Sequence, residues 1–207
     1  MSGTKERILL AALELFARGG YEAVSVQDIA DQLGITKGAL YRHYRSKREI
    51  FESILARMEQ RDAELARDNQ VPGGTAEEME EACRETDPER ITAFSKAMFR
   101  YWTLDEFASR FRRLLTLEQF RDPEMGKLYQ QYLAAGPLGY TADLLAALGL
   151  PRPEEEAAAF YAPMFLLYSV YDGAENKAAV LALLDGLLDG AGERWNEILK
   201  EGWKHGR

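Results

Sequence analysis

VSVQDIADQLGITKGALYRHYRSKREIF, residues 24–51, contains two short amphipathic segments separated by about three residues. Apolar residues recur at helical spacing from Val26 to Leu33, directly after Ser25, whose hydroxyl can cap the first free N–H groups of a helix. Gly34 ends this segment, and Thr36 can cap the next one. Two helices joined by so short a turn are typical of a helix-turn-helix.

Two further helices are expected on either side of this pair. Apolar residues from Ile8 to Phe16 form one helical stripe, which ends before Gly19 and Gly20. On the other side, Ser46 and Glu49 form a capping box that opens a helix over 46–67. The first 65 or so residues are therefore predicted to form four helices, the last of which leads into the rest of the chain.

The third helix is the predicted reading element. Leu40 and Tyr44 lie four residues apart and can face inward together. The outward positions are then Lys37, Ala39, Tyr41, Arg42 and His43. A helix fits the major groove of B-DNA, where side chains of this kind can meet base edges and phosphates.

The charge of the chain is unevenly distributed. The net charge is -8, but residues 1–60 hold nine Lys and Arg against eight Asp and Glu, whereas residues 61–207 hold seventeen against twenty-six. Residues 36–48 carry five cations and no acid. This local patch, and not the total charge, is what a phosphate backbone would meet.

The stretch from Ile8 to Phe51, and above all Val24 to Phe51, resembles the DNA-binding domain of the tetracycline-repressor (TetR) family, and its most specific portion is LGITKGALYRHYRSK at 33–47. The resemblance covers about the first quarter of the chain. It implies an all-α protein with a helix-turn-helix head at 1–50 and a larger helical body at 51–207 for effector binding and dimerisation. The implied partners are double-stranded DNA, a second copy of the chain and a small-molecule effector.

The resemblance also assigns roles within the head. Gln27, Thr36, Lys37 and Ala39 are expected near bases, and Tyr41, His43 and Lys47 near the phosphate backbone. The last three have other interpretations: Tyr41 as a packing residue, His43 as a helix-end residue, and Lys47 as a solvated charge. Ser25 is first a cap, and Gly38 lets backbone approach closely. The predicted DNA-binding set is thus Ser25, Gln27, Thr36, Lys37, Gly38, Ala39, Tyr41, Arg42, His43 and Lys47.

The body shows further breaks and starts of helices. A turn is predicted at 68–74 and a short capped helix after Thr75, while Asp87 with Pro88, and Asp122 with Pro123, open two more helices. Gly136, Pro137 and Gly139 are expected to interrupt the helical pattern.

Aromatic residues are concentrated in the body, where residues 94–140 hold ten of the twenty-two Phe, Trp and Tyr. They can fill helical cores, or they can line an apolar cavity in which a few polar groups orient a ligand. The family resemblance favours the second interpretation. The candidate ligand residues are Phe94, Met98, Trp102, Phe107, Phe111, Tyr129, Tyr132, Tyr140 and Tyr168.

The last two helices are predicted to form the dimer interface. The apolar stripe of the final helix is wide for a helix with one neighbour, so a four-helix interface with a second copy is expected, as the resemblance also implies. The candidate interface residues are Phe160, Met164, Leu184, Leu187, Leu188 and Trp195.

Composition argues against several other classes. With one cysteine and two histidines, no Cys/His metal cluster can be assembled, and no cofactor is expected. No apolar run suits a membrane span, and the start of the chain lacks a signal-peptide core, so a cytoplasmic protein is expected. No catalytic motif is apparent, so an enzyme is a remote alternative. The expected function is a ligand-responsive repressor released from a palindromic operator, with an activator or a ligand-independent regulator as alternatives.

Overall fold

The computed structural model describes residues 3–68 and 87–205, and all regular structure in these ranges is helical. The chain divides into two compact units, one formed by Met1–Asp62 and Leu104–Tyr129, the other by Ala63–Thr103 and Gln130–Arg207. The all-α prediction is confirmed. The turn and short helix predicted at 68–78 lie mostly outside the described residues. The proposed division at residue 50 stays a prediction.

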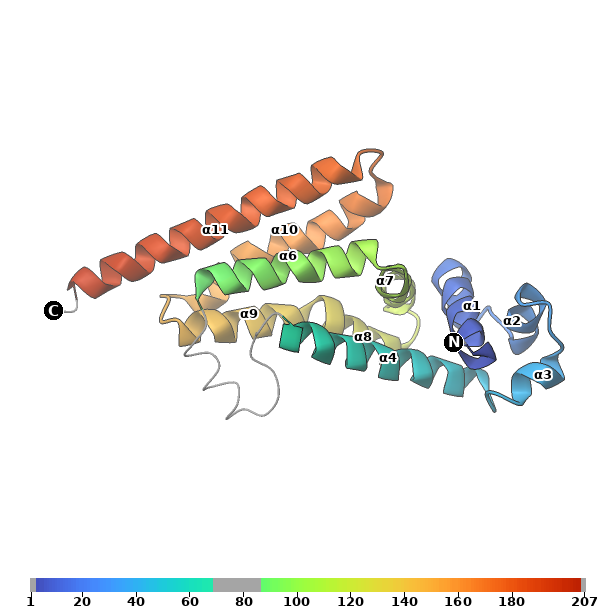
Figure 1. Cartoon of the computed structure of the whole chain (residues 1–207). Coiled ribbons are helices and arrows are strands. Elements are labelled where there is room, and N and C mark those ends of the chain that lie inside the picture. The colour runs from blue at the N-terminus through green and yellow to red at the C-terminus, as the bar shows by residue number, and fades with distance from the viewer. Residues whose placement is uncertain (1–2, 69–86, 206–207) are drawn as a thin grey trace. The chain divides into compact units, whose positions relative to one another are not determined.

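The first unit holds the helix-turn-helix. Helices α1 (Thr4–Gly19), α2 (Val26–Gln32) and α3 (Lys37–Tyr41) are followed by the long α4 (Lys47–Asp68), and Figure 1 shows their order. The core is built from residues whose side chains are fully buried, including Phe16, Ile29, Leu40 and Phe51. The apolar spacing in the sequence therefore predicted the inward faces of these helices correctly.

A helix from much later in the chain completes this unit. Helix α7 (Glu106–Glu118) packs against α1, and its Phe107, Phe111, Leu114 and Leu115 are buried. Asp105 caps α7 by accepting the N–H groups of Phe107 and Ala108. The DNA-binding domain expected from sequence thus has a noncontiguous fifth helix in its compact unit.

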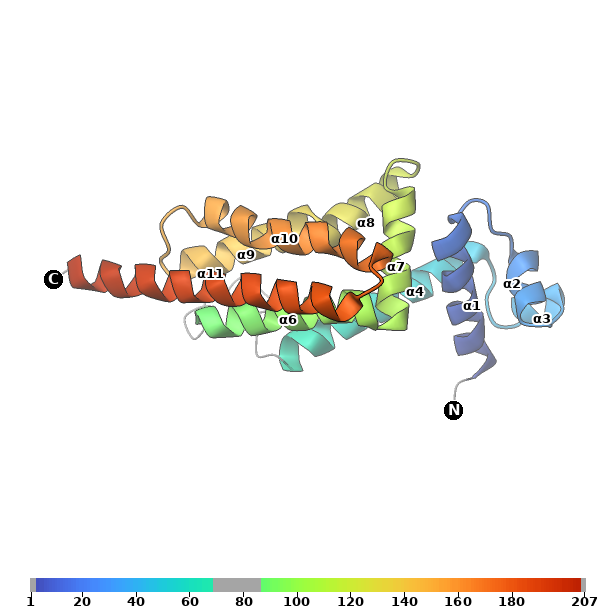
Figure 2. The same ribbon diagram turned by 90° about the horizontal axis from the view of Figure 1, so that it is seen from above.

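The second unit is a bundle of α6 (Pro88–Leu104, up to Thr103), α9 (Ala135–Ala147), α10 (Pro153–Gly173) and α11 (Lys177–His205), together with the end of α8 (Pro123–Leu133). Helix α10 contacts both α9 and α11. Figures 1 and 2 both show α11 running beside α6. The aromatic core includes Phe99 stacked on Tyr168, with ring centroids 4.7 Å apart, and Phe160 against Trp195 at 4.8 Å.

Two ion pairs between α6 and α11 define the antiparallel register of these helices. Lys96 pairs with Asp189 at 2.5 Å, and Arg100 pairs with Asp185 at 2.6 Å, one turn farther along. In the other direction, Gly192 lies against Thr92, and a Cβ atom at Gly192 would be only 3.1 Å from Thr92 Cγ2. The small residue therefore permits the close approach of the two helices.

The helical pattern is interrupted at Ala134, between α8 and α9, and not at Gly136–Gly139 as predicted, because α9 begins at Ala135 and runs through these residues. Pro137 occupies the first turn of the helix. The N–H groups of that turn have no partner four residues back, so proline costs no hydrogen bond there. The starts predicted at Pro88 and Pro123 are confirmed, and Asp87 and Asp122 accept N–H groups of the first turns.

Candidate nucleic-acid interface

The turn between α2 and α3 is organised by caps that the sequence predicts. Ser25 accepts the N–H of Asp28 at 3.2 Å, and the Asp28 carboxylate accepts the N–H of Ser25 at 2.7 Å. These hydrogen bonds lower the pKa of the Asp28 carboxyl group. Gly34 adopts the left-handed conformation at φ 65°, and Thr36 accepts the N–H of Ala39. The expected helix-turn-helix geometry is present.

The outward face of this motif matches the predicted DNA-binding set in exposure. Lys37, Gly38, Arg42 and His43 are exposed, and Tyr41 keeps 44% of its surface accessible. Of the remaining five, Ser25, Gln27 and Thr36 are exposed, while Ala39 and Lys47 are half-buried. Leu40 and Tyr44 are buried, as their spacing predicts. The α3 side chains expected to meet DNA therefore lie on the surface of their unit; their contacts with DNA stay predictions.

Not every cation of the 36–48 patch is equally available. Arg48 makes a bidentate ion pair with Glu124, at 2.5 and 2.6 Å, and also binds Glu52. These hydrogen bonds raise the pKa of the Arg48 guanidinium, and the bond to Arg48 lowers the pKa of the Glu124 carboxyl group. Lys47 donates to the carbonyl oxygen of Tyr21 at 2.8 Å. Lys37, Arg42 and Arg45 remain exposed, and the Lys37 ammonium lies 5.9 Å from the Tyr41 ring centroid.

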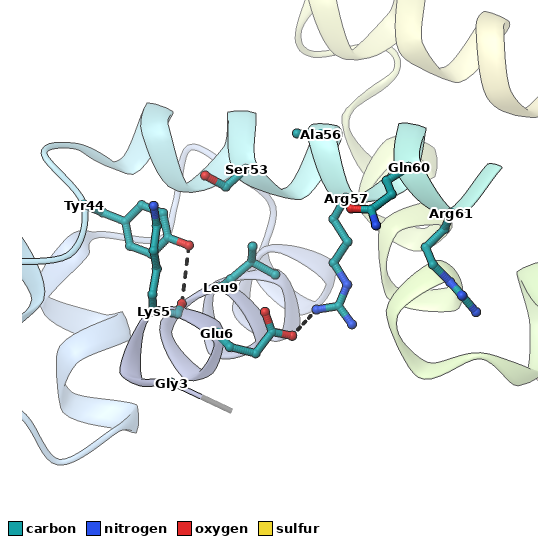
Figure 3. Close-up of a pocket in the computed structure, with 10 residues that line it drawn as sticks. All are labelled: Gly3, Lys5, Glu6, Leu9, Tyr44, Ser53, Ala56, Arg57, Gln60 and Arg61. Atoms are coloured by element: carbon teal, nitrogen blue, oxygen red, sulfur yellow. Dashed lines mark hydrogen bonds and ion pairs between the residues drawn. The ribbon is translucent and has the colours of Figure 1, made fainter. Parts of the chain in front are cut away.

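The base of the head is braced between α1 and α4. Tyr44 donates its hydroxyl to the carbonyl oxygen of Lys5, and Arg57 binds Glu6, as Figure 3 shows. These residues line an open groove of about 620 Å³, which Leu9, Ser53 and Arg61 also border. The Arg57 guanidinium also stacks over the Phe107 ring of α7, 4.3 Å from its centroid. Helix α4 is therefore tied to the head well beyond its first turn.

The Ser46 capping box forms in a modified way. Ser46 accepts the N–H of Glu49 at 3.1 Å, as predicted. The Glu49 carboxylate, however, accepts the N–H of Arg45 and not that of Ser46. The cap therefore also fixes the residue that precedes it.

The nine predicted ligand residues do not lie in one unit. Phe107, Phe111 and Tyr129 belong to the first unit, where α7 packs on α1. The other six belong to the second unit, in which Trp102 contacts Tyr132 with centroids 6.1 Å apart, and Phe94 contacts Tyr140 at 6.2 Å. The predicted set is therefore divided between the units, and the larger group, in the second unit, consists of Phe94, Met98, Trp102, Tyr132, Tyr140 and Tyr168.

Most of the predicted dimer residues are used inside the chain. Phe160, Met164, Leu184, Leu188 and Trp195 are buried in the single chain, so they have little surface left to offer a partner. Leu187 is 44% exposed. The apolar residues that α10 and α11 leave exposed are instead Phe165, Leu166, Val170, Leu183 and Leu187. Five of the six predicted interface residues are therefore core residues of the single chain, and the dimer interface itself stays a prediction.

Two features that mark other classes of protein are absent from the described residues. None of the helices there combines the length and the low charge needed to cross a bilayer. In the same parts of the chain, no three His, Cys, Asp or Glu side chains gather in a way that could hold a metal ion.

The described fold is that of an all-helical protein with a capped helix-turn-helix near its N-terminus. Residues 8–54 match the model of the bacterial regulatory proteins of the tetR family. The chain is 34% identical over 92 residues to the HTH-type transcriptional regulator YezE of Bacillus subtilis, covering 42% of this chain and 47% of YezE. It is 43% identical over 54 residues to the HTH-type transcriptional repressor BepR of Brucella suis, covering 26% of each chain.

The solved structures extend the similarity to the whole fold. A transcriptional regulator from Rhodococcus superposes with a TM-score of 0.60 at 24% identity, covering 96% of this chain and 97% of the other. The matches to YezE and BepR span less than half of either relative. The head of this chain is therefore similar to the tetR family, and the whole chain shares its fold with a regulator that is 24% identical in sequence.

Proposed function

We propose that the chain is a homodimeric, sequence-specific repressor of transcription that leaves a palindromic operator when a small apolar or aromatic effector binds its body. The observation that carries the proposal is the outer face of α3, on which Lys37, Tyr41 and Arg42 are exposed. Such a face suits phosphates and base edges in the major groove. Repression, in preference to activation, is proposed by analogy with BepR, a named repressor that is 43% identical over 54 residues.

The second part of the proposal is the dimer. The exposed stripe of α10 and α11 offers Leu166 at 63% and Leu183 at 54% accessible surface, with small residues such as Gly186 and Gly190 beside it. A self-complementary pair of such helices from two copies would form a four-helix interface. Two reading helices in one dimer would then meet major grooves about 34 Å apart.

The effector would act on the aromatic cluster of the second unit. Trp102, Tyr132 and Tyr168 combine apolar rings with polar groups, which is the lining typical of sites for small molecules. By linkage, an effector that lowers operator affinity is itself bound more weakly by the DNA-bound dimer, by the same factor.

Selection of bound fragments from random duplex DNA at two salt concentrations tests the proposal. A palindromic consensus with half-sites one helical turn apart is expected, and affinity for it should fall steeply between 50 and 200 mM salt (on the order of 10³-fold for about six phosphate contacts). Sequence-blind binding at both salt concentrations would contradict it. A thermal-shift screen with apolar and aromatic compounds then addresses the effector, with addition of a hit expected to release the selected duplex.

A further inference from the structure

The loop between α1 and α2 is held from two sides by side chains that belong to other helices. On one side, Glu118 at the end of α7 accepts the N–H of Tyr21 at 3.1 Å, and this carboxylate is almost completely buried. On the other side, Lys47 in the first turn of α4 donates to the carbonyl oxygen of the same Tyr21. Both backbone polar groups of one residue are therefore fixed by charged groups from outside the loop.

The Tyr21 side chain joins α1 and α4. Its ring lies 5.1 Å from that of Phe16 on α1 and 5.3 Å from that of Phe51 on α4, while the Lys47 ammonium lies over it at 4.2 Å. Four residues farther along, Ser25 caps α2. A displacement of Tyr21 would therefore reach both α4 and the first helix of the helix-turn-helix.

Gly20 shows that the backbone is shaped around this carboxylate. It adopts φ 87°, a conformation that favours glycine, and a Cβ atom there would lie 2.3 Å from Glu118 Oε1. The loop and the carboxylate therefore require a glycine at this position on two separate grounds. Arg121, whose guanidinium is 3.7 Å from the carboxylate, partly balances its charge.

We infer that Glu118 is a positioning residue of the DNA-reading head, through which α7 sets the α1–α2 loop in the conformation that binds the operator. The inference rests on the proposed function and deepens it, since it makes operator affinity depend on a helix that lies more than fifty residues after the helix-turn-helix. Glu118 does not touch DNA in this role. It supplies a buried acceptor to a backbone donor that would otherwise be unsatisfied.

The test measures, in the full chain, the affinity of variants for the selected palindrome and for an unrelated duplex, together with hydrogen exchange at residues 20–32. Glu118→Ala should weaken operator binding about tenfold and speed exchange at Tyr21 and in α2, with non-specific binding within about twofold of wild type. Glu118→Gln retains the acceptor oxygen and should restore operator affinity to within about twofold. Glu106→Gln, at an exposed acid in the first turn of the same helix, is the matched control and should also change affinity by less than about twofold.

Gly20→Ala disturbs the contact from the loop. It should weaken operator binding at least as much as Glu118→Ala, but it should cost less in a chain that already carries Glu118→Ala, because the atom that the new Cβ would strike is gone. If Glu118→Ala is too unstable to purify, Glu118→Asp takes its place, because it keeps the charge but draws the acceptor back from the Tyr21 N–H, and it should weaken operator binding in the same direction. Affinity near that of wild type in Glu118→Gln and a loss of affinity in Gly20→Ala are expected.

Any one of three results would overturn the inference about Glu118 while leaving the proposed function intact. They are wild-type operator affinity in Glu118→Ala, equal losses of operator affinity in Glu118→Ala and Glu118→Gln, and a proportional loss of specific and non-specific DNA binding. A wild-type chain that selects no palindrome would instead overturn the proposed function. The exchange measurement, which needs no DNA, would in that case still decide whether Glu118 fixes the loop.

Discussion

The predicted DNA-reading face of α3 exposes charged and polar side chains, whereas the outer face of α10 and α11 exposes apolar ones. Around α3, the apolar residues Leu40 and Tyr44 are buried, and cations and a tyrosine hydroxyl are presented to solvent. On α10 and α11, Phe165, Leu166 and Leu183 remain exposed although their helices already have a well-packed core behind them. A charged face suits a hydrated polyanion, whereas an exposed apolar stripe suits a second protein surface. The difference predicts two partners with different responses to salt.

The largest expected effect comes from charging the apolar stripe. Leu166→Glu combined with Leu183→Glu should convert the dimer to monomers and lower operator affinity about 100-fold or more, because the two heads no longer bind as one linked pair. Analytical ultracentrifugation measures the mass of the oligomer, and fluorescence anisotropy measures the affinity for the operator. Phe120→Glu, at a residue 92% exposed in the other unit, is the control and should alter neither. A variant that stays dimeric would place the interface elsewhere.

The next effect concerns Asp62, a half-buried acid in α4. Burial, with a contribution from Glu59, raises the pKa of Asp62 to about 7, and its Oδ1 atom has no hydrogen-bond partner among the described residues. The unfolded chain loses this proton near pH 4 and the folded chain near pH 7, so the free energy of unfolding falls as pH rises between these values.

Asp62→Asn should therefore leave stability unchanged near pH 4 and raise it by about 2 kcal/mol above pH 7. Urea unfolding at a series of pH values measures this. The control is Asp68→Asn, because Asp68 is exposed on the same helix. A constant difference at all pH values would mean that Asp62 titrates normally.

A smaller effect is expected at the charged face. Lys37→Ala should lower operator affinity about tenfold and relax the base preference at one position of each half-site, because Lys37 is expected near a base. Lys200→Ala, an exposed lysine on α11, should do neither. Fragment selection with the Lys37→Ala variant measures the preference, and an unchanged consensus would remove Lys37 from the residues near bases.

The smallest effect separates two tyrosines three residues apart. Tyr41→Phe should weaken operator binding about threefold and leave stability unchanged, because its exposed hydroxyl is expected to donate only to DNA. Tyr44→Phe should instead cost about 1 kcal/mol of stability, since it removes the hydrogen bond to Lys5. Thermal unfolding and anisotropy of both variants distinguish the roles, and the reverse pattern would exchange them.

Short-range features of the chain were predictable because their causes are local. The Ser25 and Thr36 caps, the turn at Gly34 and the buried pair Leu40 and Tyr44 follow from residues within four positions of one another. Helix starts at Pro88 and Pro123 are local in the same way. The error at Pro137 arose because a proline can begin a helix as well as break one, and local pattern does not say which.

The residues predicted for the dimer interface show the limit of prediction from helical periodicity. The spacing of apolar residues in α11 marks two stripes, one with Leu184 and Leu188 and one with Leu183 and Leu187. Only packing against α6 and α10 decides that the first is buried in the chain and the second is exposed. The same holds for the aromatic cluster, in which Phe107 and Phe111 pack with the head while Trp102 and Tyr132 pack in the body.

The amino-acid sequence by itself determined that the chain is helical, that it begins with a helix-turn-helix and which side of α3 is polar, because hydrogen-bonded caps and helical periodicity act over a few residues. The tertiary structure alone decided that Glu118 meets Tyr21, that Arg48 is paired with Glu124, and which leucines face outward. The contacts of Glu118 and Arg48 join residues that are 97 and 76 positions apart in the sequence. A local sequence pattern cannot predict such contacts, because they depend on how whole helices pack together.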